Sequence, residues 1–147
     1  MDRRRGFGLY VHWPFCQAKC PYCDFNSHVS STIDHGVWRD ALVSEIRRAA
    51  TETGGRVLDS IFFGGGTPSL MSPETVSDVI DIAREVWAPS NEIEITLEAN
   101  PTSVEASRFR AFADAGVNRV SIGVQSLIDE DLRALGRLHS ADEACAA

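Results

Sequence analysis

Hydrophobic positions recur along this chain with two different periods, and stretches of the two kinds follow one another in turn. A period of two predicts a strand, whereas apolar residues three and four positions apart predict an amphipathic helix. The short period predicts strands over residues 7–12, 57–63, 92–98 and 118–126. The longer period predicts helices over residues 35–55, 72–87, 102–116 and 129–139, with the start of another at 140–147. About four successive strand–helix units indicate an α/β fold with a parallel sheet, right-handed crossovers and helices outside the sheet.

The ends of the predicted helices carry signals of their own. Ser72 is placed to cap the second helix, and Pro73 occupies its first position, where a missing amide hydrogen costs nothing. Thr102 and Glu105 have the spacing of a capping box at the start of the third helix, which is expected to end at Gly116. These signals separate the predicted helices from the strands on either side.

Each predicted strand has an apolar face and a polar face. In the third strand Ile93, Ile95 and Leu97 lie on one side, and alternation puts the intervening polar residues on the other. The polar faces of the first, third and fourth strands hold Gly8, Tyr10, His12, Glu94, Thr96, Glu98, Ser121, Gly123 and Gln125. If helices cover the apolar face, the polar face looks inward across a curved sheet, where a barrel packed for stability alone would place Val, Ile and Leu. This arrangement predicts that something polar binds there, and the alternative is a one-layer sheet with a wet face.

Composition and charge narrow the class of protein. The chain has 147 residues, enough for one domain, and its formal net charge of −7 offers no general basic surface for nucleic acid. No window approaches ~18 uninterrupted apolar residues, so no transmembrane segment is expected. The arginine-rich start resembles a secretion signal, but His12 and Pro14 interrupt its apolar stretch and it lacks a small-residue cleavage site. We therefore expect a cytoplasmic protein, in which clustered cysteines more often bind metal or do chemistry than form disulfides.

Three of the four cysteines, Cys16, Cys20 and Cys23, are clustered in one short stretch. The string CPYC on its own resembles a glutaredoxin site, but that chemistry needs a cysteine at a helix N-terminus, and the polar DFNSHVSST follows instead. Structural zinc, with Cys145 or a histidine as the fourth ligand, would more usually come with a second paired knuckle. A C-x3-C-x2-C triad in one loop favours a [4Fe–4S] cluster held by three thiolates, whose fourth iron stays free of protein ligands. An open position on a redox metal is where a substrate or cofactor can bind.

The string C-QAK-C-PY-C resembles the signature of the radical S-adenosylmethionine (SAM) enzymes. The wider string LYVHWPFCQAKCPYCDFNS is similar to one branch of them, the oxygen-independent coproporphyrinogen III oxidases and the related HemW heme chaperones. The resemblance continues through FFGGGTPSLM, LEANP, NRVSIGVQS and LGRLHSADEA, nearly to the end of the chain. It implies a partial (β/α) barrel of the radical SAM type. It also implies a [4Fe–4S] cluster, held by the three clustered cysteines, whose open iron SAM chelates through its amino and carboxylate groups.

The resemblance also implies which residues bind SAM. They are Tyr10, Tyr22, Gly65, Gly66, Thr67, Glu98, Gln125 and Arg137. The glycines let the backbone approach a ligand closely, and their GGGTP loop follows a strand, at the edge where parallel barrels place their sites. The loop lacks the lysine and Ser/Thr of a phosphate loop, so a nucleotide triphosphate is not expected. Glu98 and Gln125 end their strands on the inward face, where a buried carboxylate needs a partner such as the SAM cation.

One position separates the two functions of this branch. The oxidases carry a further cysteine two residues after the triad, whereas this chain has Asp24 and then Phe25, which matches the HemW pattern. The resemblance therefore implies a heme chaperone that takes heme as cargo, delivers it to an acceptor protein and uses a low-potential electron donor. The alternative is anaerobic oxidative decarboxylation of coproporphyrinogen III. Because the family chain continues further, residues 1–147 are expected to be the N-terminal part of a radical SAM core domain.

Apart from the zinc alternative, which takes Cys145, His12 or His28 as its fourth ligand, the sequence leaves the roles of the remaining histidines and the fourth cysteine open. His12 faces inward by alternation, and His139 lies in the family-like string RLHS. His28 and His35 are expected in loops. Cys145 lies in an Ala-rich helical stretch and is expected to be a small core residue.

Overall fold

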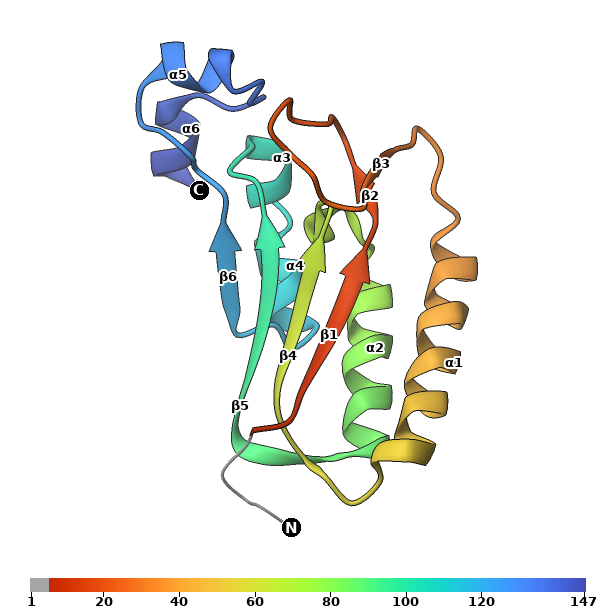
Figure 1. The fold of residues 1–147 in the computed structure, drawn as a ribbon. Coiled ribbons are helices and arrows are strands. Elements are labelled where there is room, and N and C mark those ends of the chain that lie inside the picture. Colours follow the sequence, from red (N-terminus) through yellow and green to blue (C-terminus); the bar gives the residue numbers. More distant parts are fainter. Residues whose placement is uncertain (1–5) are drawn as a thin grey trace.

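The computed structural model describes residues 6–147, and its centre is a four-stranded parallel sheet. The strand order β1-β4-β5-β6 adds each new strand beside the preceding one (Figure 1). The strands are β1 Gly8–Trp13, β4 Val57–Gly65, β5 Ala88–Ala99 and β6 Arg119–Ile122, with a separate short pair formed by β2 Phe15–Cys16 and β3 His28–Val29. The predicted α/β fold with a parallel sheet is confirmed.

Two long helices cover one face of the sheet, and shorter helices follow the later strands (Figure 1). The helices are α1 His35–Thr53, α2 Pro73–Val86, α3 Ser103–Ala106, α4 Phe109–Asp114, α5 Asp129–Ala134 and α6 Ala141–Ala146, with a 3-10 turn η1 at Pro68–Leu70. Figure 1 shows α1 and α2 side by side along the sheet, while α5 and α6 lie beyond the carboxyl end of β6. None of the helices in the described residues has the length and apolar character needed to span a membrane.

The hydrophobic core lies between the apolar face of the sheet and the helices α1 and α2. Ile95 and Leu97 of β5 are fully buried in it, and so is Ile80 of α2. On the opposite face Tyr10 and Glu94 are exposed. The predicted alternation is therefore correct in direction: helices cover the apolar face, and the polar face is exposed at Tyr10 and Glu94, although Thr96 on that face is fully buried.

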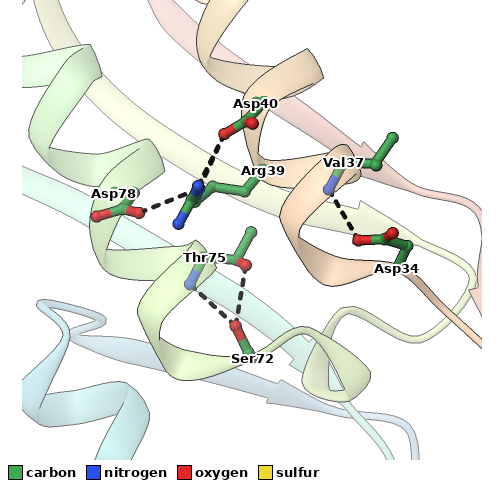
Figure 2. Close-up of polar contacts among 7 residues, drawn as sticks. All are labelled: Asp34, Val37, Arg39, Asp40, Ser72, Thr75 and Asp78. Atoms are coloured by element: carbon green, nitrogen blue, oxygen red, sulfur yellow. Dashed lines mark hydrogen bonds and ion pairs between the residues drawn. The ribbon is translucent and has the colours of Figure 1, made fainter.

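Side chains cap the starts of α1 and α2 (Figure 2). Ser72 Oγ accepts from the Thr75 amide at 3.1 Å and Pro73 is the first residue of α2, as predicted. Asp34 caps α1 in the same way, because its carboxylate accepts from the Val37 amide at 3.0 Å. Each cap satisfies an amide that has no partner within its helix, which typically stabilises a helix by about 1 kcal/mol.

Arg39 connects the two long helices at their surface (Figure 2). Its guanidinium contacts Asp40 of α1 at 2.9 Å and lies 3.7 Å from the Asp78 carboxylate of α2. Arg39 is half-buried and both carboxylates are exposed, so water screens these ion pairs and they contribute little to stability. The packing of α1 on α2 therefore depends mainly on their apolar faces.

The helix predicted over residues 102–116 is interrupted and forms α3 and α4. Thr102 Oγ1 accepts from the Glu105 amide at 3.3 Å, but the Glu105 carboxylate turns to the Asn100 amide at 2.8 Å and does not complete the predicted capping box. Arg108, just before α4, donates to two backbone carbonyls at the end of η1, at 2.6 and 2.7 Å. Contacts with neighbouring loops thus replace the contacts of one continuous helix.

The elements near the end of the chain are shorter than the sequence pattern predicts. The strand expected over residues 118–126 ends as β6 at Ile122. The helix after it, α5, ends just before Gly136, whose left-handed φ of 68° turns the chain away. The expected last helix is present as α6, with a complete capping box between Ser140 and Glu143.

Candidate functional site

A cavity of about 340 Å³ opens at the carboxyl ends of the strands. Its walls come from the loop after β2, the ends of β4 and β5, the turn after β6 and the segment between α5 and α6. Figure 1 shows these segments at the same end of the sheet. Parallel α/β proteins place ligand sites at this edge, because the loops from successive strands converge there. The volume suits a small organic ligand.

The cavity brings together most of the residues that the sequence singled out. The predicted site residues that line it are Cys16, Cys20, Tyr22, Cys23, Gly65, Gly66, Thr67, Glu98, Gln125 and Arg137. Among the described residues, Tyr10 lies outside the wall: its hydroxyl contacts His12 Nδ1 at 3.1 Å, and its ring stacks on Phe62. Burial, and secondarily the charge of Glu98, raises the pKa of Tyr10 above its ordinary value. Tyr10 therefore sits on the polar face of the sheet, within electrostatic reach of the cavity residue Glu98.

The three clustered cysteines are free thiols. Cys16 is buried at the end of β2, whereas Cys20 and Cys23 are half-buried and belong to a turn in which the Cys23 amide donates to the Cys20 carbonyl at 3.0 Å. Cys20 is not at a helix N-terminus, because the next helix, α1, begins only at His35. This argues against the glutaredoxin-like alternative, in which a helix dipole lowers the pKa of the first thiol.

Hydrogen bonds fasten the cysteine loop to the sheet. His12 Nε2 contacts the Asn26 carbonyl at 2.9 Å, and because a carbonyl only accepts, Nε2 carries the proton and Nδ1 accepts from the Tyr10 hydroxyl. His28, expected in a loop, belongs to the short β3 and donates its amide to the Pro14 carbonyl at 2.7 Å. His12 is thus a fully bonded anchor for the loop that carries the cysteines.

Two glycines let the end of β4 approach the cysteine loop. A Cβ on Gly66 would lie 2.6 Å from the Phe15 carbonyl oxygen and 3.0 Å from Cys16 Sγ. Gly65 has a left-handed φ of 113°, and a Cβ there would meet the Trp13 carbonyl oxygen at 2.7 Å. A side chain at either position would push the loop away from β4. The glycines therefore set the distance between the GGGTP loop and the first cysteine.

A buried carboxylate connects three of the walls. Glu105 is 3% exposed and lines the cavity, and its carboxylate accepts from the Ser69 hydroxyl and from the Asn100 amide. Asn100 Oδ1 in turn accepts from Arg137 Nη2 at 2.6 Å. The spacing of residues predicts Glu105 only as a helix cap, and it predicts no role for Ser69 or Asn100. The position of Asn100, directly after a strand and before Pro101, was the available signal for a polar group at this edge.

Arg137 places a cation in the cavity wall. It donates to the Gly123 carbonyl at 2.6 Å and lies 3.4 Å from the Tyr22 hydroxyl and 3.5 Å from Cys20 Sγ. Burial raises the pKa of Tyr22 above its ordinary value, and the charge of Arg137 acts in the opposite direction. Arg137 thus joins the turn after β6 to the cysteine loop.

The remaining candidates occupy different surroundings. Gln125 and His139 both line the cavity, and His139 is buried with its Nε2 atom 3.0 Å from the Val124 carbonyl oxygen. Cys145 is exposed, so its expected core position is wrong, because α6 buries none of its residues. His35, expected in a loop, is instead the first residue of α1.

The fold and the site define a parallel α/β protein with a cysteine-lined cavity at the carboxyl ends of its strands. The family model described as the Radical SAM superfamily matches residues 10–147, and the chain belongs to this superfamily. It is 51% identical over 137 residues to the radical S-adenosyl methionine domain-containing protein 1, mitochondrial, of Mus musculus, which covers 92% of this chain and 31% of that protein. It is 45% identical over 137 residues to the heme chaperone HemW of Escherichia coli, which covers 92% of this chain and 36% of that one.

The structure is similar to that of the E. coli coproporphyrinogen III oxidase HemN, described as a radical SAM enzyme. The TM-score is 0.85 at 31% sequence identity, over 97% of this chain and 33% of that one. The chain thus spans about a third of the length of these relatives. The similarities support the HemW- and HemN-like branch that the sequence motifs indicate.

The superfamily implies a [4Fe–4S] cluster and SAM, and the cavity is lined by donor groups of the kinds that both require. Free thiols share one cavity with the Arg137 guanidinium. Among the described side chains, the buried atoms Arg137 Nε and Ser27 Oγ in this wall lack a hydrogen-bond partner, which a polar ligand would supply. Within residues 6–147, no three Cys, His, Asp or Glu side chains are close enough together to hold a metal ion. Binding a cluster therefore requires the loop to bring its thiols together.

Proposed function

We propose that this chain holds a [4Fe–4S] cluster through Cys16, Cys20 and Cys23 and binds SAM in the adjoining cavity. The observation that carries the proposal is that these thiols line one cavity together with the GGGTP loop and Arg137. A reduced cluster held by these thiols would supply the electron for the reductive cleavage of SAM, and the residues of the cavity would bind, orient and shield the reactants. Membership of the radical SAM superfamily supports the same assignment.

Each wall of the cavity has a proposed part in binding SAM. Arg137 pairs with the SAM carboxylate, and the charge it presents is already directed by its bonds to neighbouring loops. The residues proposed for the rest of SAM are Gly65, Gly66 and Thr67 for the methionine part, Glu98 and Gln125 for the amine and ribose hydroxyls, and Tyr22 for the adenine. The contact predicted for Tyr10 stays a prediction, and its position next to Glu98 makes an indirect effect through that carboxylate the simpler proposal.

We infer that the whole protein acts on heme as a chaperone of the HemW type. Phe25 lines the cavity and is 57% exposed, at the position where the oxidases of this branch carry a further cysteine. The second candidate is anaerobic oxidation of coproporphyrinogen III, which the likeness to the HemN structure favours. The acceptor protein, the electron donor and the cytoplasmic location stay predictions, and a relative named as mitochondrial makes the location a separate question.

The cluster is tested by anaerobic reconstitution with iron and sulfide. The wild-type protein should take up about four irons per chain and show an absorbance band at about 400 nm. Each of the changes Cys16→Ala, Cys20→Ala and Cys23→Ala should abolish this uptake, whereas the exposed Cys145 can be changed to alanine without effect. Stoichiometric zinc without iron uptake would refute the cluster in favour of a structural metal.

The choice between chaperone and oxidase is tested on the whole protein with its cluster reconstituted. The chaperone assignment predicts that it binds heme and passes it to an apoprotein acceptor, and that it does not convert coproporphyrinogen III under anaerobic reducing conditions with SAM. Turnover of coproporphyrinogen III would overturn the assignment, and heme binding without turnover would support it.

A further inference from the structure

The turn after β6 contains a strained backbone position. Among the described residues, Gln125 is the one non-glycine residue with a positive φ, at 70°. The Ser126 amide donates to the Val124 carbonyl at 3.0 Å, so Gln125 is the central residue of a γ-turn of the left-handed, rarely populated kind. A residue with a side chain keeps such a conformation only where its surroundings impose it, and this strain is concentrated at functional sites.

Side chains from a later segment hold this turn in place. His139 Nε2 lies 3.0 Å from the same Val124 carbonyl oxygen, and because a carbonyl only accepts, Nε2 carries the proton and donates. His139 is 5% exposed, so water competes little for this bond. Arg137 donates to the Gly123 carbonyl at 2.6 Å. The side chains of Arg137 and His139 therefore donate hydrogen bonds to two consecutive backbone carbonyls immediately before Gln125.

The strain lies on a residue whose side chain reaches the cavity. Gln125 lines the cavity, whereas the glycine of this turn stands at position 123, where the φ is not positive. A glycine at position 125 would adopt the left-handed conformation without steric cost, but it would bring no amide to the wall. The strained conformation thus falls on Gln125, whose side-chain amide can form hydrogen bonds.

We propose that His139 is a positioning residue: through the Val124 carbonyl it holds the γ-turn that directs the Gln125 amide to SAM. This inference rests on the proposed SAM site and assigns a role to a histidine that has no other part in it. His139 touches no ligand in this scheme. Its effect passes through one backbone hydrogen bond, so any side chain that keeps the donor should preserve it.

The test compares two nearly isosteric replacements of His139 in the whole protein with its cluster reconstituted. His139→Met removes the donor and should weaken SAM binding about tenfold, the effect of one lost hydrogen bond. His139→Gln keeps an N–H donor at similar reach and should restore most of the affinity. SAM affinity is measured by equilibrium dialysis, and Arg133→Gln on the exposed surface of α5 is the matched control with unchanged affinity.

A double-mutant cycle shows whether His139 acts through Gln125. Gln125→Ala alone should weaken SAM binding, and adding His139→Met to it should cost little more, because the amide to be positioned is already gone. Additive losses would overturn the proposal, and so would equal affinities for the Met and Gln variants of His139.

The strain has a readout that does not depend on SAM. Gln125→Gly should melt about 3 °C above Gln125→Ala, because only glycine tolerates the left-handed φ without cost. If Ala and Gly melt alike, the strained turn is refuted, whether or not the His139→Met variant folds. If wild type and all variants fail to bind SAM while Gly still melts above Ala, the proposed SAM site has failed and the role of His139 fails with it, but the strained turn stands.

Discussion

Replacing Glu105 by alanine is expected to lower the free energy of unfolding by about 3 kcal/mol. The carboxylate is the shared acceptor for the Ser69 hydroxyl and the Asn100 amide, and Glu105 is only 3% exposed. Removing it leaves the Ser69 hydroxyl and the Asn100 backbone amide without this partner where water has little access, and it also removes the longer contact of 3.4 Å from Asn100 Nδ2. A buried donor left unpaired costs about 1–3 kcal/mol, and water entering the space of the lost side chain recovers part of that sum.

The same experiment separates the loss of an acceptor from the loss of volume. Glu105→Gln keeps the shape and one acceptor oxygen, so it should cost about 1–2 kcal/mol. The control is Glu52→Ala, which removes an exposed carboxylate 3.2 Å from Arg48 and should cost less than about 0.5 kcal/mol. Equilibrium unfolding in urea, followed by circular dichroism with an unchanged m-value, measures all three. If Glu105→Ala lay within about 0.5 kcal/mol of wild type, the carboxylate would not be the acceptor that joins these loops.

Four further substitutions test other parts of the molecule. Gly66→Ala should prevent cluster retention while leaving the far-ultraviolet spectrum unchanged, since a Cβ would lie 2.6 Å from a neighbouring carbonyl oxygen, and normal iron uptake would contradict this. In the Tyr22→Phe variant, Tyr10 is the remaining tyrosine, and its absorbance titration should give a pKa above 10.0. Because the folded state favours the neutral phenol, the contribution of Tyr10 to folding stability should be present below pH 10.0 and lost as the pH rises through that raised pKa. Glu98→Gln should lower this pKa, and no change would exclude that carboxylate as a cause. Phe112→Ala, at a fully buried ring, should cost about 3–5 kcal/mol in thermal or urea unfolding, and a loss below about 1 kcal/mol would mean that the ring is not in the core.

The parts of this fold that follow from local chemistry could be predicted from the sequence. The alternation of Ile95 and Leu97 with polar residues is correct because a strand buried on one face must repeat every second residue. Ser72 caps α2 because a serine side chain can bond an amide close to it in sequence. The cavity wall could be predicted in outline, since parallel strands all end at one edge and Glu98 stands at such an end.

The interrupted helix after β5 could not be predicted in this way. Thr102 and Glu105 have the spacing of a capping box, but only half of it forms: the Glu105 amide donates to Thr102 Oγ1, while the Glu105 carboxylate accepts from the Asn100 amide instead. The competing partner is fixed by tertiary structure, because the Ser69 hydroxyl reaches the same carboxylate from 36 residues away. Local spacing carries no information on a partner so distant in the chain, so the sequence pattern favoured the wrong arrangement.

The γ-turn at Gln125 could not be predicted from the sequence for a related reason. Backbone carbonyls just beyond the end of a strand have no partner in the sheet, and where they are shielded from water they need donors from other segments. At this edge Arg137 and His139 donate to the Gly123 and Val124 carbonyls. Every residue carries a backbone carbonyl, so the sequence does not show which carbonyl acts as the acceptor. Only the side-chain donors can be recognised from the sequence. An Arg or His shortly after a strand–loop–helix unit therefore indicates that a backbone carbonyl nearby needs a donor. The carbonyl to which this side chain donates shows which loop is held against the cavity.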